Sequence, residues 1–260
     1  KISNFYNRLI LRFFDMDDKI SELKKQLDLI LENYAVDKVK SDSGGNRRSK
    51  KGILTKDIYS KIIQFAIEEI GLDFKFYYKK SRLPKKIQKQ LPYLNLSENF
   101  EFNRKFDNQG KGNSVDYDGF LIFEGQIKML LEFKSYTEVS MLKRVYLDAK
   151  IAKKFIPDVK YYLCMLESAF GTFDKEDKKK ASKDIAYQKH RYFISKSAIT
   201  LIDYLQKTLN VEVNIFFLMN GIRDSKRDIG IKKFLKKVDL DELKFTVDSF
   251  INFFQSFKKN

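Results

Sequence analysis

Three charged residues, Asp118, Glu132 and Lys134, stand in a mostly apolar stretch of the chain. Two carboxylates held a few ångströms apart repel each other, and burial raises their pKa, so the arrangement persists only with positive charge between them. A hard divalent cation is the natural candidate, because Mg²⁺ commonly takes one or two carboxylates together with water and a substrate phosphate. Lys134 could then hold or deprotonate an attacking water, or stabilise charge on a phosphorane. The residues predict a Mg²⁺ site with Asp118 and Glu132 as ligands.

A predicted β-hairpin positions these groups. Two apolar runs of strand length, 115–123 and 127–133, flank a Glu-Gly pair that favours a tight turn, because glycine adopts positive φ at low cost. Side chains alternate along a strand, and pairing across the short turn brings Asp118 almost opposite Glu132. Asp116 shares a face with Asp118, so it remains an alternative ligand.

The D-x13-E-x-K spacing on a hairpin resembles the active site of the PD-(D/E)xK nucleases, the superfamily that includes most type II restriction endonucleases. In this resemblance Asp118 takes the place of the hairpin Asp, Glu132 that of the acidic ligand and Lys134 that of the Lys. The sequence departs from the pattern because Val-Asp-Tyr, and not Pro, precedes Asp118. The continuation FKSYTEVSMLKRVYLDA further resembles restriction enzymes that cut an asymmetric site with two related but non-identical subunits.

The resemblance covers roughly residues 55–166, where the predicted order is helix, strand, hairpin, helix, strand. It implies an α/β fold in which a mixed β-sheet is flanked by helices, as in a restriction-endonuclease-like core. We expect an N-terminal helical arm (1–40), a basic flexible linker (41–53) and a nuclease domain (54–260). Residues 167–260 would then serve DNA recognition and packing.

The resemblance also implies hydrolysis of duplex DNA at a defined sequence, leaving a 5′-phosphate and a 3′-hydroxyl. A double-strand cut needs two such sites, so a homodimer or a heterodimer is expected, with a cognate DNA methyltransferase in the same system. One alternative is a Holliday-junction or repair nuclease of the same superfamily. The other is a non-catalytic basic DNA-binding or coiled-coil protein, for which the hairpin acids would be incidental.

A helix is predicted from Thr55, a good N-cap, to Ile70, with Gly71 just past its end. Glu69 lies in the middle of its apolar face, and a buried carboxylate needs a partner. In many relatives of the resembled family a Glu from the first helix joins the metal site, and Glu69 is positioned to do so. The alternative is that Glu69 reaches solvent at the helix end.

Apolar residues recur at alternating spacings of three and four near the start of the chain, in a stripe formed by Phe13, Met16, Ile20, Leu23, Leu27, Ile30 and Tyr34. The stripe fits either a coiled coil with a second subunit or an amphipathic helix packed on the chain's own body. Packing on its own core is the commoner outcome.

Fifty-one Lys and Arg against 35 Asp and Glu give a net charge of +16, which suits a polyanion such as DNA. Candidate contacts fall in the linker, on the helix after the hairpin and in a long polar connection. They are Arg47, Arg48, Lys50 and Lys51, then Lys143 and Arg144, then Gln188, Lys189 and Arg191. The alternative for each basic segment is a solvated surface without specific function.

Several absences narrow the chemistry to carboxylates. A single cysteine, Cys164, excludes an internal disulfide, and with no sign of secretion the cytoplasm is expected. A single histidine, His190, argues against zinc fingers and catalytic triads. The chain has no phosphate-binding G-x4-G-K-[ST] loop, and no apolar run approaches the roughly 20 residues that cross a bilayer.

Overall fold

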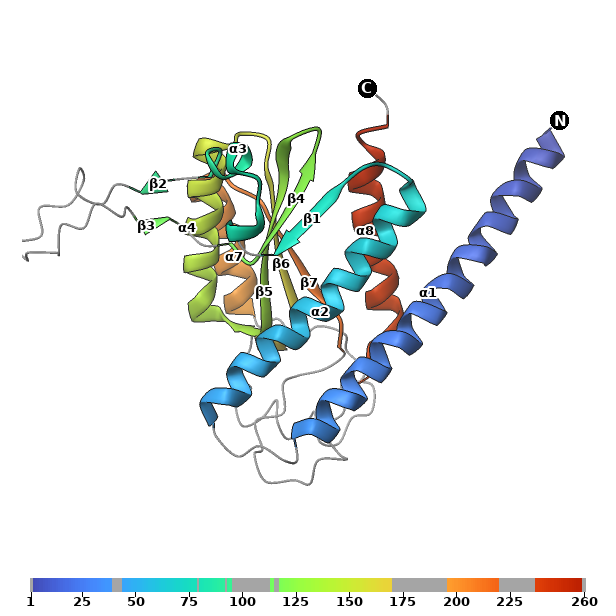
Figure 1. Ribbon diagram of the computed structural model, residues 1–260, viewed down its shortest axis with the longest axis horizontal. Helices are drawn as coiled ribbons and strands as arrows, with labels where there is room; N and C mark the ends of the chain where they lie inside the picture. The colour runs from blue at the N-terminus through green and yellow to red at the C-terminus, as the bar shows by residue number, and fades with distance from the viewer. Residues whose placement is uncertain are drawn as a thin grey trace, which may run out of the picture.

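A mixed five-stranded sheet forms the centre of the computed structural model, which describes residues 2–38, 44–78, 80–91, 93–94, 113–114, 117–169, 196–219 and 237–258 (Figure 1). The strand order is β1-β4-β5-β6-β7, antiparallel from β1 to β5 and parallel from β5 to β7. The strands are β1 (Lys75–Tyr78), β4 (Gly119–Phe123), β5 (Gln126–Glu138), β6 (Lys160–Ala169) and β7 (Val213–Phe217).

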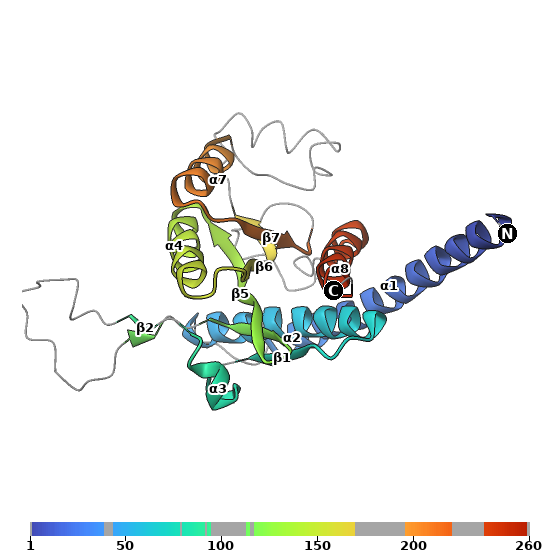
Figure 2. The ribbon, with the colours of Figure 1, turned by 90° about the horizontal axis from the view of Figure 1, so that it is seen from above.

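Helices cover both faces of the sheet, giving three layers (Figure 2). On one face lie α1 (Ile2–Lys38), α2 (Gly44–Ile70) and α8 (Leu240–Gln255). On the other lie α4 (Val139–Phe155) and α7 (Lys196–Leu209), with the short elements η1 (Lys80–Arg82) and α3 (Lys85–Gln88) near β1 and β4. A separate two-stranded pair joins β2 (Tyr93–Leu94) to β3 (Asn113–Ser114). The predicted α/β architecture with helices flanking a mixed sheet is confirmed.

The central strand β6 is apolar on both sides because helices cover both of its faces. Tyr162, Cys164 and Leu166 join the core beneath α2 and α8, whereas the alternating residues Tyr161 and Leu163 join the core beneath α4. Because successive side chains of a strand point to opposite faces, the continuous apolar run YYLCML forms two hydrophobic surfaces.

The predicted hairpin is present as β4 and β5. Its two-residue turn has positive φ at both positions, 50° at Glu124 and 73° at Gly125, as a type I′ turn requires. Phe123 pairs with Gln126 across it. Gly125 adopts this conformation without steric cost, whereas Glu124 does so against the usual preference of a residue with a Cβ.

The stripe on α1 packs on the protein's own body. Ile20, Leu23 and Leu27 are buried in the core with α2 and α8, and Met16 and Ile30 pack against it. The first part of α1 extends beyond the rest of the fold (Figure 1). In its described part, the stripe therefore packs on the protein's own core. The side chain of Phe13 lies outside the described side chains.

The predicted flexible linker is wrong for residues 44–53, because α2 already begins at Gly44. Thr55, the predicted N-cap, lies fully buried inside this helix. Arg and Lys are good helix formers, so the basic run after the two glycines extends the helix by several turns. In the described helices, no segment is long and apolar enough to span a membrane.

Candidate active site

A bulge in the hairpin sets the register of the candidate site. β4 and β5 shift register by one residue beside Lys128. In a regular hairpin closed by the same two-residue turn, Asp118 would lie opposite Leu131 and on the other face from Glu132. With the bulge, Gly119 pairs with Leu131, and the next step places Asp118 opposite Glu132. The predicted juxtaposition is correct, but it depends on this irregularity.

Backbone hydrogen bonds hold Asp118 at the start of β4. Its own N–H donates to the carbonyl of Leu131 at 3.1 Å. The N–H of Phe133 donates to Asp118 Oδ2 at 2.9 Å, so the carboxylate is anchored to the facing strand. One carboxylate oxygen is thereby oriented by the sheet, while the side chain as a whole stays 43% exposed.

Lys134 bridges the two acids. Its Nζ lies 2.5 Å from Glu132 Oε1 and 3.8 Å from Asp118 Oδ2. The Glu132 side chain is 8% exposed and that of Lys134 31%, so the site is closed beneath Glu132 and open to solvent on the side of Asp118 and Lys134. The three predicted residues meet as the spacing indicated.

Burial dominates the electrostatics of the site. It raises the pKa of Glu132, the neighbouring charge of Asp118 raises it further, and Lys134 opposes both effects. The net shift is upward. Ionisation of Glu132 therefore costs free energy, and additional positive charge nearby would reduce that cost.

Two tyrosines line the buried side of the site. The Tyr161 hydroxyl is buried and has no hydrogen-bond partner among the described residues. Its ring centroid lies 6.0 Å from that of Tyr117, and the pKa of Tyr161 is raised by burial and then by the charges of Glu132 and Asp148. An unpaired buried hydroxyl beside carboxylates is a site where an ordered water would gain partners.

Glu69 does not join the site, so this prediction is corrected. The hydroxyl of Tyr59, also on α2, donates to the carbonyl of Met165 at 2.7 Å, and Met165 pairs with Lys134. Glu69 lies ten residues further along α2, about 15 Å away at roughly 1.5 Å per residue. Its carboxylate instead contacts Lys19 of α1 at 3.2 Å. The apolar face on which it was placed packs against α1, which supplies the partner.

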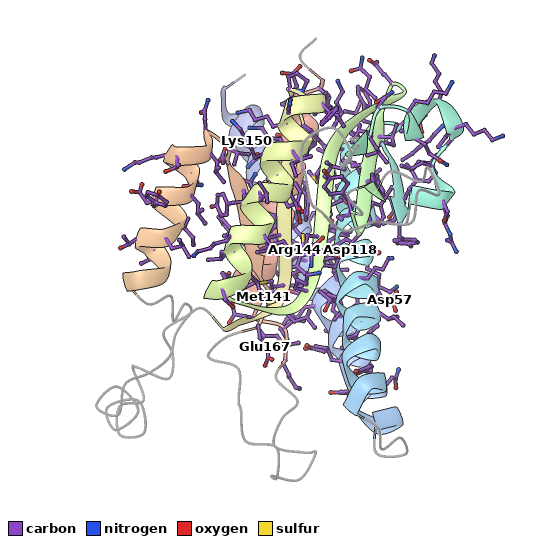
Figure 3. The ribbon with its side chains drawn as sticks, turned by 90° about the vertical axis from the view of Figure 1, so that its left-hand side faces the viewer. Asp57, Asp118, Met141, Arg144, Lys150 and Glu167 are labelled. Atoms are coloured by element: carbon purple, nitrogen blue, oxygen red, sulfur yellow. The ribbon has the colours of Figure 1, made fainter. Side chains whose placement is uncertain are left out.

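Sequence reasoning missed Asp148 on α4. Burial raises the pKa of its carboxyl, and the charges of Arg144 and Lys134 lower it. Its negative charge in turn raises the pKa of Glu132. The signal available in the sequence was its i,i+4 spacing from Arg144 next to the buried face of the helix. In Figure 3, Asp57 on α2 is a further exposed acid on the side of the molecule that carries Asp118.

The donor set fits a hard cation held by two protein ligands. Among the described residues, no group of three or more His, Cys, Asp and Glu side chains could hold a metal ion. Asp118 and Glu132 supply two oxygen donors, and Mg²⁺ typically completes such a site with water and substrate phosphate. The side chain of Asp116 lies outside the described side chains, so the preference for Asp118 rests on its position opposite Glu132.

The predicted DNA contacts are described only in part. Lys143 and Arg144 are exposed on α4, on the sheet face that carries Glu132 and Lys134. The other predicted contacts fall outside the side chains that the structure describes: Arg47, Arg48, Lys50, Lys51, Gln188, Lys189 and Arg191.

Fold and site together define an α/β protein with a lysine between two carboxylates on a hairpin of its central sheet. The chain is similar to the type II restriction enzyme DdeI from Desulfomicrobium norvegicum, with 28% identity over 136 residues. The match covers 52% of this chain and 50% of that enzyme, so the chain spans about half the length of the relative. No protein-family model matches the chain. No solved structure matches it either.

Proposed function

We propose that this chain is a Mg²⁺-dependent endonuclease of the type II restriction kind that hydrolyses phosphodiester bonds in double-stranded DNA at a defined sequence. The observation that carries the proposal is the position of Lys134 Nζ, 2.5 Å from Glu132 and 3.8 Å from Asp118 at the solvent-facing side of the hairpin. The distant similarity to a restriction enzyme and the positive net charge support the same class. The PD-(D/E)xK assignment belongs to this proposal.

Each residue has a distinct role in the proposed reaction. Asp118 and Glu132 would hold the divalent ion, which when bound would supply positive charge to the phosphate and to the attacking water. Water attacks phosphorus and gives a proton to solvent, the bond from phosphorus to the 3′ oxygen breaks, and that oxygen takes a proton from solvent and leaves as a hydroxyl. Lys134 holds the water or stabilises the added negative charge on the phosphorane. The products are a 5′-phosphate and a 3′-hydroxyl.

A second copy or a second subunit completes the proposed enzyme. One hairpin site hydrolyses one strand, so a double-strand cut requires two sites that face opposite strands. The proposal therefore includes a homodimer or a heterodimer. It also includes a cognate DNA methyltransferase in the same system, because an enzyme that cuts a defined sequence would otherwise cut its own genome.

Plasmid digestion tests the proposal. The wild-type protein with plasmid and Mg²⁺ is expected to produce discrete bands, and chelation of the metal is expected to abolish them. Glu132→Gln and Lys134→Ala should lower the cutting rate by at least about 100-fold, since each removes a group that acts on the reacting phosphate. Lys207→Ala is the matched control, because Lys207 is an exposed lysine of α7 whose ammonium pairs with Asp203 at 2.8 Å.

Three results would count against the proposal in different ways. DNA binding without cutting would favour a non-catalytic DNA-binding protein. A preference for four-way junctions over linear duplex would favour a junction or repair nuclease. Undiminished cutting by Lys134→Ala would show that the hairpin residues are not the active site.

A further inference from the structure

An ion pair on α4 lies beside the hairpin acids and has no part in the proposed roles of Asp118, Glu132 and Lys134. Arg144 Nε is 3.6 Å from Asp148 Oδ2, one helical turn further along. The Asp148 side chain is only 18% exposed, whereas that of Arg144 is 80% exposed. The pair therefore joins a mostly buried carboxylate to a guanidinium that faces solvent.

Asp148 lies level with Lys134. The chain passes directly from β5 into α4 at Glu138 and Val139, and the helix runs back along the strand (Figure 1). Lys134 is about 15 Å from that junction at roughly 3.3 Å per residue, and Asp148 is about 14 Å from it at roughly 1.5 Å per residue. Arg144 lies about 6 Å nearer to the junction by the same measure.

Contacts from the hairpin confirm this placement of Asp148. The hydroxyl of Tyr117, the residue before Asp118, donates to the backbone carbonyl of Asp148 at 3.5 Å. The charge of Lys134 also lowers the pKa of the Asp148 carboxyl against the effect of burial. Figure 3 shows Arg144 and Asp118 at a similar height, with Lys150 nearer the opposite end of α4.

Stability does not account for the pair. An exposed i,i+4 ion pair on a helix contributes little, and a mostly buried carboxylate carries a desolvation cost. A guanidinium held at one nitrogen keeps its remaining N–H donors in a fixed fork, which matches the oxygens of a phosphate. The pair is thus built to present a directed donor at the open side of the site.

We propose that Arg144 binds the phosphate that is being cut and stabilises its charge in the transition state, with Asp148 as the residue that positions it. This inference rests on the proposed nuclease function. It assigns Arg144 a role in the reaction, beyond general affinity for the DNA backbone, and it gives Asp148 a role that acts only through Arg144.

Single-turnover cleavage with protein in excess tests the inference, together with DNA affinity measured without divalent ions. Arg144→Ala is expected to lower the cleavage rate at saturation by about 100-fold. Arg144→Lys should recover only part of it, because lysine lacks the planar fork. Asp148→Asn should lower the rate by about 10-fold, and in the Arg144→Ala background it should cause no further loss. Lys150→Ala, an exposed lysine of the same helix, is expected to match the wild type.

The outcomes separate this inference from the proposed function. If the wild-type protein does not cut DNA, both are wrong. If it cuts and Arg144→Ala loses affinity but keeps the wild-type rate at saturation, Arg144 contacts a neighbouring phosphate and the inference alone is wrong. An effect of Asp148→Asn that persists in full without Arg144 would also overturn it. Thermal unfolding of each variant checks that the fold is retained, which is expected at Arg144 because its side chain is 80% exposed.

Discussion

Glu132 and Asp118 lie opposite each other on the hairpin, yet the side chain of Glu132 is 8% exposed and that of Asp118 is 43% exposed. Burial therefore makes ionisation of Glu132 costly. Asp118 is solvated and anchored by the Phe133 N–H, whereas Glu132 depends on Lys134 for compensation. The buried acid is the one whose charge opposes folding.

Glu132→Gln is expected to leave the metal-free protein at least as stable as the wild type at neutral pH, although it should lower the proposed cutting rate by at least about 100-fold. The pKa of Glu132 is raised from its ordinary value of 4.5 by burial and by Asp118. Between that value and the raised one, the native state binds more protons than the unfolded state, so the wild-type protein loses stability as pH rises through this window. The glutamine variant lacks this loss.

Thermal unfolding in chelator, from about pH 4 to pH 8, measures the effect. The stability of Glu132→Gln relative to the wild type should grow as pH rises and then level off. Asp118→Asn is the comparison at the solvated position. A relative stability that shrinks with rising pH would contradict the upward pKa shift.

Gly119→Ala is expected to destabilise the protein by about 1–3 kcal/mol, because it overpacks a filled site. A Cβ at Gly119 would lie 3.0 Å from a ring atom of Phe133, 3.1 Å from one of Phe76 and 3.3 Å from Leu131 Cβ. Cleavage should fall as well, since Gly119 follows Asp118 and Phe133 anchors its carboxylate. Urea unfolding measures the stability change.

Gly52→Ala is the control for this substitution. Gly52 lies within α2 and a Cβ there would meet nothing within 4 Å. Alanine should raise stability by up to about 1 kcal/mol, since glycine is a poor helix former. Equal stability of the two alanine variants would show that the space around Gly119 is not filled.

Tyr161→Phe is expected to change the free energy of unfolding by less than about 1 kcal/mol, because the removed hydroxyl is buried without a partner among the described residues. Tyr59→Phe provides the contrast, since that hydroxyl donates to the Met165 carbonyl at 2.7 Å. Its removal should cost about 1–3 kcal/mol by leaving an acceptor unpaired. Chemical denaturation compares the two, and a larger cost at Tyr161 would reveal a bound partner for its hydroxyl.

Glu69→Gln is expected to leave the cleavage rate unchanged. Its carboxylate contacts Lys19 in the groove between α1 and α2, and it lies about 15 Å along α2 from Tyr59, the residue of that helix whose hydroxyl contacts Met165 beside Lys134. Digestion of plasmid beside the wild type and Glu132→Gln checks this. A loss that approaches that of Glu132→Gln would indicate that Glu69 contributes to the proposed metal site.

Local patterns in the sequence were sufficient for much of the fold. Alternation of apolar residues predicted β4 and β5, the Glu-Gly pair predicted their turn, and spacings of three and four predicted the buried stripe of α1. These features depend on neighbours within a few residues, where backbone geometry dictates which side chains share a face. The start of α2 was missed because glycines and charges resemble a linker when only composition is considered.

The sequence by itself determined that Asp118, Glu132 and Lys134 would share one end of a hairpin, because strand alternation and a short turn leave few other arrangements. Only the tertiary structure decided that the register shift beside Lys128 aligns the two acids, that Glu132 is buried while Asp118 is solvated, and that Glu69 turns to Lys19. It also brought Asp148 of α4 level with Lys134. Burial and long-range pairing depend on helices packed from distant parts of the chain, and no local spacing encodes which of them will cover a given carboxylate.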